Sequence, residues 1–275
     1  MESSLCQTMD NDVIPEPGVI QITYWQAGGV QKLLATSSHY FIGLMEDDCT
    51  VLKYPVLKNL DSLISLREEA DRYARVGPHE NLVTCKGLNQ DGFLLLEYCE
   101  RGDLLHLIEG HVILTHIQKM AIGTQIARCL AHLHKQNFIH CDIHVRNVFI
   151  TSGMVAKVGD LQGQLYRHDG SIEIEAMSQE NSKSRHPLAG EDEFSKRTDI
   201  FALGTLLYHL WHGHPPFEEL DEYRQEEVIQ GRYRAGQYPI DVEHAAGIDA
   251  LIGKCWTSRY GDMSEVLDDM ERLSW

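Results

Sequence analysis

The stretch HCDIHVRN, residues 140–147, carries Asp142 and Asn147 five positions apart and decides how the rest of the chain is interpreted. On its own, this pair also fits a turn in which Asp and Asn bond only the local backbone. The segments on either side decide between a turn and a functional loop. Strand signals dominate up to about residue 98, and helical signals dominate after residue 102.

The first part of the chain predicts a small β-rich unit. Short segments rich in β-branched or aromatic residues and separated by turn residues are typical of strands. They are VIQITYW, HYFIGLM, CTVLKY, LVTCKGL and GFLLLEY. The segment SLISLREEADRYARVG, residues 62–77, differs from them. Its apolar residues recur at helical spacing, and Gly77-Pro78 then ends the predicted helix.

The second part predicts a larger, mainly helical unit. Residues 115–137 form an amphipathic pattern, and DIFALGTLLYHLWHG, residues 199–213, predicts a helix buried at the centre of a lobe. Between them, NVFIT and MVAKVGD predict a hairpin around Ser152-Gly153. Residues 164–195 are polar and without periodicity, so we predict a long loop there. Long ordered loops in compact domains are usually functional.

The composition is that of a globular protein with a sizeable core and excludes some partners. The 275 residues are 43% hydrophobic and 24% charged, and their formal net charge is −17. Nucleic-acid backbones are bound by clustered Lys and Arg, so this charge argues against a nucleic-acid partner. An acidic surface can favour basic peptide substrates, but a solvated acidic face is the simpler interpretation.

The sequence gives no sign of export or of a membrane span. The seven cysteines form no C-x-x-C pair, and we interpret them as reduced thiols. No run approaches the ~18 apolar residues of a membrane helix. The polar residues 1–18, which we expect to be a loose tail, lack the pattern of a signal peptide. We therefore expect a cytoplasmic or nuclear protein, a monomer with no membrane partner.

Several segments, taken in order, resemble the protein kinase family over about residues 35–273. They are CTVLKY, LLLEYCERGDLLHLI, HCDIHVRN, GDLQG, TDIFALG with the trailing HPPF, and KCW. The resemblance implies an α+β, bilobal fold with a small β-rich N-lobe, residues 19–98, holding one main helix, and a larger α-helical C-lobe, residues 99–275. The segments HCDIHVRN and GRYRAGQYP are similar to those of a divergent group of fungal protein-kinase-like proteins.

Phosphoryl transfer needs a bound nucleotide, metal ions and an aligned acceptor hydroxyl more than it needs covalent chemistry. By the resemblance, Asp142 accepts or orients the proton of the hydroxyl of a protein substrate. Asn147 and Asp160 bind Mg²⁺, with Leu161 as an apolar plug behind Asp160. Arg146, four residues after Asp142, supplies positive charge to the transferring group.

The resemblance also implies the nucleotide contacts in the N-lobe. Lys53 binds the α- and β-phosphates of ATP and pairs with Glu69, with Glu68 as the second choice. The backbone of Glu97 and Cys99 faces the adenine, with Leu96 at the back of the pocket. Further along, Asp199 braces the catalytic loop by bonding its backbone N–H groups, since such a buried Asp requires partners.

Departures from the family pattern put nucleotide binding and regulation in doubt. No G-x-G-x-x-G precedes Lys53, and the equivalent segment offers only Ser37, Ser38 and Gly43. Cys141 replaces the Arg that commonly pairs with a phosphorylated activation loop. The segment RHPLAGEDE stands in place of a clear A-P-E, with Glu191 as the counterpart of its Glu.

The segment after Asp160 also departs from the pattern. Gln162 stands where the family has Gly, so we predict that Gly163 supplies the backbone freedom instead. The leading interpretation is an ATP- and Mg²⁺-dependent protein kinase, with Ser/Thr favoured over Tyr. A pseudokinase scaffold is the main alternative, and a small-molecule phosphotransferase is the third.

Overall fold

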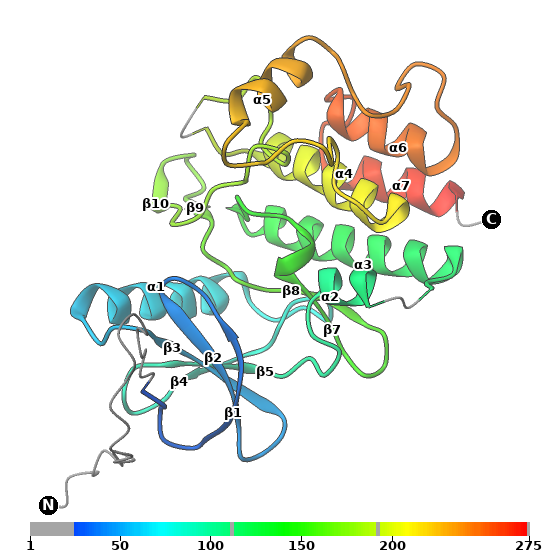
Figure 1. Ribbon diagram of the computed structural model, residues 1–275. Helices are drawn as coiled ribbons and strands as arrows, with labels where there is room; N and C mark the ends of the chain where they lie inside the picture. The colour runs from blue at the N-terminus through cyan, green and yellow to red at the C-terminus, as the bar shows by residue number, and fades with distance from the viewer. Residues whose placement is uncertain (1–24, 111–112, 191–192, 274–275) are drawn as a thin grey trace, which may run out of the picture.

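The structure is a computed structural model that describes residues 25–110, 113–190 and 193–273 (Figure 1). The predicted tail, residues 1–18, lies outside these ranges. So does the predicted strand VIQITYW, except for its last residue, Trp25. The N-terminal lobe is one antiparallel sheet of five strands in the order β1-β2-β3-β5-β4, with one helix. Its elements are β1 Val30–Thr36, β2 Tyr40–Met45, β3 Thr50–Pro55, α1 Leu60–Val76, β4 Cys85–Leu88 and β5 Leu94–Glu97.

The C-terminal lobe is mainly helical, and α3, α4, α6 and α7 form its body (Figure 1). Its helices are α2 Leu104–Glu109, α3 His116–Lys135, the 3₁₀ turn η1 Val145–Asn147, α4 Lys196–His212, α5 Glu226–Arg234, α6 Gly247–Trp256 and α7 Met263–Leu273. Its short strands are β6 Phe138–Ile139, β7 Val148–Ile150, β8 Ala156–Val158, β9 Gln164–Tyr166 and β10 Ile172–Ile174. The bilobal α+β architecture expected from the sequence is confirmed.

Register in the N-lobe sheet decides which side chains face α1 and the other lobe. Lys53 on β3 pairs with Ile42 on β2 and with Leu94 on β5, and paired residues of adjacent strands point to the same face. The neighbouring pair Phe41 and Tyr54 therefore lies on the opposite face, where Trp25 packs edge-on against Tyr54. The sheet thus separates an aromatic outer core from a face that carries Lys53.

Helix α1 is held in place by its ends and by an unusual buried face. The Asn59 side chain accepts the N–H of Ser62 at 2.8 Å, and Gly77, at φ 71°, ends the helix. The buried face includes two charged residues, Glu69 and Arg72, beside apolar ones. Buried charges require partners, so this face of α1 must meet polar groups elsewhere.

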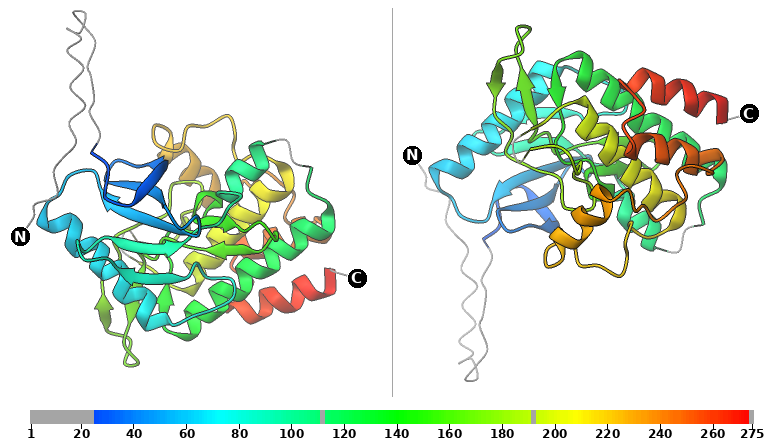
Figure 2. Two further views of the ribbon diagram at one scale, coloured as in Figure 1. Left: turned by 90° about the horizontal axis from the view of Figure 1, so that it is seen from below. Right: turned by 90° about the horizontal axis from the view of Figure 1, so that it is seen from above.

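Backbone hydrogen bonds join the two lobes behind the catalytic segments. Val83 N–H donates to Val158 O, and Val158 N–H donates to Asn81 O, both at 2.8 Å. In addition, His132 Nε2 on α3 lies 2.9 Å from the Val76 carbonyl oxygen at the end of α1. Figure 1 shows α1 on the side of the N-terminal lobe that faces the C-terminal lobe, and seen from below the helix runs along one edge of the molecule (Figure 2). These bonds fix where β8, and the Asp160 that follows it, lies relative to α1.

Helix α4 forms the centre of the C-terminal lobe, as its apolar sequence predicted. Twelve of its residues, Thr198 to Tyr208 and Leu210, are buried. Gly204 allows α6 to approach, because a Cβ there would lie 2.7 Å from Cys255 Cβ. Helix α3 is also buried on most sides, with Ile122, Ile126 and Leu133 in the core, whereas Ile117 is 80% exposed. The periodicity of the sequence predicts that Ile117 lies on the buried side with Met120 and Leu130, so that prediction was only partly right.

The prediction of a long loop over residues 164–195 was wrong for its first part, but it holds over residues 175–190, which contain no helix or strand. Strands β9 and β10 form a hairpin, and β9 also pairs with β6 in front of the catalytic loop. The sequence carried a signal for it, since Asp169-Gly170 is a turn dipeptide between two short apolar segments, and Gly170 has φ 84°. The later part is anchored too: Thr205 Oγ1 and Tyr233 Oη both donate to Lys183 O.

No described helix has the length and apolar character needed to cross a membrane.

Candidate functional site

Lys53 joins three distant parts of the chain. Its Nζ lies 2.7 Å from Glu69 Oε2 on α1 and 2.5 Å from Asp160 Oδ1 after β8. Lys53 and Glu69 are buried, whereas the side chain of Asp160 is 29% exposed. One ammonium thus bridges an internal carboxylate and a carboxylate that faces solvent. The structure places Glu69 at Lys53, and not Glu68, which lies 3.7 Å from Arg72 Nη1 instead.

Mutual attraction between Lys53 and its two carboxylates opposes the effect of burial on their charges. Desolvation lowers the pKa of Lys53, but attraction to Asp160 and Glu69 outweighs it and raises that pKa overall. Desolvation also opposes ionisation of Asp160, but Lys53 draws its pKa below the ordinary value. For Glu69, burial raises the pKa, so its charge depends on Lys53. Removing the lysine would leave two carboxyl groups without their counter-ion.

The carboxylate of Asp142 is oriented through both of its oxygens. Oδ1 lies 3.3 Å from His144 Nε2, and Oδ2 accepts from Asn147 Nδ2 at 3.2 Å. His144 Nδ1 accepts the N–H of Arg146 at 3.1 Å, so the proton of the neutral ring is on Nε2 and points at Asp142. His144 is a neighbour of Asp142 that sequence reasoning did not include in the site.

Asp199, at the start of α4, organises the catalytic loop from beneath. Its Oδ2 accepts the N–H of His140 at 2.9 Å and lies 2.8 Å from His134 Nε2, and its Oδ1 accepts the N–H of Cys141 at 3.1 Å. The His140 ring in turn lies 3.0 Å from Gly159 O, directly before Asp160. The bracing role expected for Asp199 is therefore what the geometry shows.

Asn147 and Asp160 are brought together by the backbone. Gly159 N–H donates to Asn147 O at 2.9 Å, next to the antiparallel pair β7 and β8. Within the described residues, neither Asn147 Oδ1 nor Asp160 Oδ2 accepts a hydrogen bond, so both oxygens are available. No cluster of three or more His, Cys, Asp or Glu in that part of the chain forms a metal site by itself. One amide and one carboxylate oxygen fit Mg²⁺, which keeps waters and takes its other ligands from phosphates.

The backbone around Asp160 corrects one expectation. The left-handed conformation belongs to Asp160 itself, at φ 60°, and not to Gly163. Gly163 is needed for space instead, because a Cβ there would lie 2.0 Å from Ile139 O and 2.5 Å from His140 O. Leu161 is fully buried, as expected of an apolar plug. Strained residues of this kind persist only where the surrounding structure holds them.

The segment proposed to face adenine begins at Glu97, the last residue of β5. Glu97 N–H donates to Thr84 O, and the Glu97 carboxylate binds Lys157 Nζ at 2.9 Å. Cys99 is buried, its carbonyl accepts from Gly102, and burial raises the pKa of its thiol to about 12. Among the described residues, the backbone N–H of Cys99 has no acceptor. That free donor is what recognition of a base edge requires.

The turn that replaces the glycine-rich loop is tight and polar. Ser37 N–H donates to Tyr40 O at 2.8 Å, and this hydrogen bond closes the turn between β1 and β2. Gly43 lies in the middle of β2, where a Cβ would be 2.5 Å from a methyl carbon of Val30, so it serves strand packing and not the turn. The ring of Tyr40 lies over Lys53, with its centre 5.2 Å from Lys53 Nζ. Sequence reasoning did not identify Tyr40 as a site residue.

Two residues named from the sequence are not drawn into this network. Arg146 is exposed, and within the described ranges its guanidinium makes no ion pair. Glu191 lies outside the described residues. The segment before Glu191 is anchored by His186, whose Nε2 lies 2.9 Å from Ser258 Oγ.

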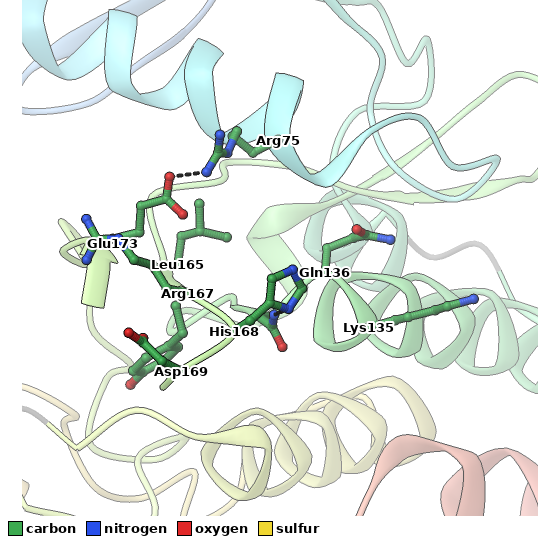
Figure 3. Close-up of a pocket in the computed structure, with 10 residues that line it drawn as sticks. Arg75, Lys135, Gln136, Leu165, Arg167, His168, Asp169 and Glu173 are labelled. Carbon is green, nitrogen blue, oxygen red and sulfur yellow. Dashed lines mark hydrogen bonds and ion pairs between the residues drawn. The ribbon is translucent and has the colours of Figure 1, made fainter. Parts of the chain in front are cut away.

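A separate cavity of 540 Å³ lies on the other side of the hairpin, between the ends of α1 and α3 (Figure 3). Arg75, Lys135, Arg167 and His168 give it a basic lining, partly neutralised by Asp169 and Glu173. Figure 3 shows Arg75 reaching from α1 to Glu173, with which it forms an ion pair. None of the nucleotide-site residues lines this cavity.

Comparison with known proteins agrees with this geometry. A family model described as protein tyrosine and serine/threonine kinase matches residues 51–266, most of the chain. A Caenorhabditis elegans protein named as a candidate tyrosine-protein kinase, F09A5.2, is 24% identical over 79% of this chain and 27% of its own length. The serine/threonine-protein kinase Nek5 of Mus musculus is 28% identical over 70% of this chain and 31% of its own.

The Aurora kinase of Eremothecium gossypii is 29% identical over 51% of this chain and 39% of its own length. The chain therefore spans less than half of each of these three relatives. The family match covers both lobes from β3 to α7, including every segment that forms the Lys53, Asp142 and Asp160 network. The chain belongs to the protein kinase family.

Proposed function

We propose that the protein transfers the γ-phosphoryl group of ATP to a hydroxyl of a protein substrate, in a reaction that depends on Mg²⁺. The observation that carries the proposal is the bridge from Lys53 to Glu69 and Asp160, which the Gly159–Asn147 hydrogen bond joins to the loop of an oriented Asp142. Catalysis of this kind is mostly positioning and charge stabilisation. A purely structural protein gains little from carboxylates held close together.

The roles follow from the contacts. Lys53 binds phosphate oxygens, and Glu69 keeps its ammonium pointed into the cleft. Asp142 takes the proton of the acceptor hydroxyl while the new O–P bond forms and the bond from the γ-phosphorus to the departing ADP oxygen breaks. Bound Mg²⁺ would be held by Asn147 and Asp160 and would supply positive charge to the phosphates.

We propose Ser or Thr as the acceptor in preference to Tyr. The names of Nek5 and of a Saccharomyces cerevisiae relative, CDC5/MSD2, support this, since both are serine/threonine-protein kinases. The candidate tyrosine-protein kinase of Caenorhabditis elegans points the other way. Phosphoamino-acid analysis of the labelled product decides, and phosphotyrosine alone would overturn the preference.

The central experiment measures transfer of labelled phosphate from Mg-ATP to a generic basic protein and to the chain itself. Asp142→Asn and Asp160→Asn should each reduce the rate by at least a hundredfold, because each removes a charge that the reaction needs. The exposed Asp268→Asn on α7 is the matched control and should retain the wild-type rate. Full activity in both site variants would remove the assignment.

A second candidate, a scaffold that does not use nucleotide, is favoured by the tight β1–β2 turn and by Tyr40 over Lys53. A thermal-shift assay separates the two. A ligand at a hundred times its Kd stabilises a protein by about 2.7 kcal/mol, so millimolar Mg-ATP should raise the Tm of a kinase. No shift, together with no transfer, would favour the scaffold.

A further inference from the structure

Arg72 is a buried charge that the proposed reaction does not use. It lies on α1, three residues after Glu69, and its side chain is 0% exposed. Its acidic neighbour Glu68 is 3.7 Å away with a side chain that is 42% exposed, so this long ion pair offsets only part of the loss of water. Burial lowers the pKa of this guanidinium. A group this costly to bury requires other partners.

Those partners are backbone groups at the neck of the β9–β10 hairpin. Arg72 Nε donates to Gly163 O at 3.0 Å, directly before β9, and Nη2 donates to Glu175 O at 2.6 Å, directly after β10. Nη1 lies 3.5 Å from Met177 Sδ. One planar guanidinium therefore holds the entry and the exit of the hairpin together, which the fork geometry of Arg allows and a single ammonium does not.

The same contacts lead directly to the site. Gly163 is three residues after Asp160, and Met177 N–H donates to Gln162 O at 2.7 Å. The segment that follows the hairpin is therefore bonded to the residues next to Asp160. Gly163 also packs against the carbonyls of Ile139 and His140 at the start of the catalytic loop. Because Glu69 is one turn away from Arg72, α1, Asp160 and the catalytic loop are fixed relative to one another through Gly163.

We propose that Arg72 is a positioning residue that sets the Lys53–Glu69–Asp160 arrangement by clamping α1 to the hairpin neck, without any phosphoryl group on that segment. The inference rests on the proposed function for its catalytic consequence. Cys141 is consistent with it: the residue is buried, burial raises its thiol pKa, and a neutral thiol offers nothing to a phosphate.

Arg72→Met tests the clamp, because it keeps an unbranched apolar side chain but removes every donor to the hairpin neck. Two carbonyl oxygens lose their partner, so some loss of stability is expected as well. We expect kcat to fall at least tenfold while KM for ATP changes less than threefold, since alignment is lost and the cleft is kept. Arg72→Lys restores the charge on a single nitrogen, which cannot reach both carbonyl oxygens, and should recover less than a third of the wild-type kcat. It also replaces Arg72→Met in the test if the latter does not fold.

Arg75→Gln is the matched control one turn further along α1. It removes the ion pair with Glu173 at the rim of the cavity in Figure 3, but it leaves the hairpin neck intact. Its kcat should stay within twofold of the wild type. Equal losses in Arg72→Met and Arg75→Gln, or a kcat within twofold in Arg72→Met, would overturn the proposal.

Hydrogen exchange gives a readout that does not depend on activity. In Arg72→Met, amides of residues 163–177 and of α1 should exchange at least tenfold faster, with those of α4 and α6 unchanged. If the wild type transfers no phosphate, the proposed function fails, whereas this exchange pattern still decides the clamp. Unchanged exchange at residues 163–177 would overturn the clamp even in an active enzyme.

Discussion

Gly163 approaches Ile139 so closely that a Cβ on the glycine would lie 2.0 Å from the Ile139 carbonyl oxygen. The two residues belong to the segments that carry Asp160 and Asp142, and β9 pairs with β6 at this point. The obstacle is backbone and not a flexible side chain. The separation of the segments that carry Asp142 and Asp160 therefore depends on a contact that only glycine allows.

Gly163→Ala should push these two segments apart. We expect a loss of about 1–3 kcal/mol in the free energy of unfolding, as for overpacking of a tight core, and a fall in phosphotransfer of at least tenfold. Urea denaturation and the transfer assay measure the two effects. Gly231→Ala on α5, where nothing lies within 4 Å of the added Cβ, is the control and should be neutral or stabilising by about 0.5–1 kcal/mol. A wild-type rate in Gly163→Ala would contradict the tight contact.

Asp199→Ala should destabilise the protein more than the same substitution of a surface aspartate, because three donors lose their acceptor at once. Removing one partner of a buried charged network costs about 3–5 kcal/mol. The midpoint of denaturation should fall accordingly. Asp249→Ala, which removes an exposed pair with His212, should cost less than about 1 kcal/mol. Similar costs for the two variants would show that Asp199 does not organise the loop.

Lys53→Met should abolish transfer and also expose the dependence of Glu69 on its counter-ion. We expect a loss of about 3–5 kcal/mol in unfolding free energy, because a buried carboxylate is left uncompensated. Adding Glu69→Gln to this variant should recover part of that stability but none of the activity. The exposed Lys32→Met should match the wild type in both. A double variant no more stable than Lys53→Met would refute the coupling.

His209 on α4 should make stability depend on pH. Desolvation, with the positive charges of His214, Lys183 and Arg146, lowers its pKa from 6.5 to about 4. The folded state thus holds the neutral ring. Its contribution is fully present above about pH 6.5 and is lost as the pH falls towards 4, because the unfolded chain binds the proton first.

His209→Gln should therefore flatten the decline of unfolding free energy between pH 6.5 and 4 by about 1–2 kcal/mol, allowing for partial solvent screening of this group. Denaturant titrations at several pH values measure it. The exposed His106→Gln serves as the control and should leave the slope unchanged. An identical slope in His209→Gln and the wild type would contradict the burial of a neutral imidazole.

The sequence alone determined the class of fold and most elements. The helical spacing of residues 62–77 and the apolar run of residues 199–213 correspond to α1 and α4, because both patterns arise from local periodicity. It missed β9 and β10, whose three-residue strands are too short to show a period. The sequence also led us to predict that Gly163 supplies the backbone freedom lost at Gln162. The actual constraint on Gly163 is its steric contact with Ile139.

The candidate site divides in the same way. Lys53, Asp142, Asn147 and Asp160 were identified through the resemblance to protein kinases, whose motifs have fixed residue types in a fixed order. Arg72 and Tyr40 were not, because each meets its partner only through the fold: backbone carbonyls remote in sequence for Arg72, and the Lys53 ammonium for Tyr40. His144 was not, because the local backbone conformation decides that its ring faces Asp142. What the sequence itself determined is which groups are present and in which order. Only the tertiary structure decided which of them meet, because burial and hydrogen bonding act between segments that the chain alone does not place together.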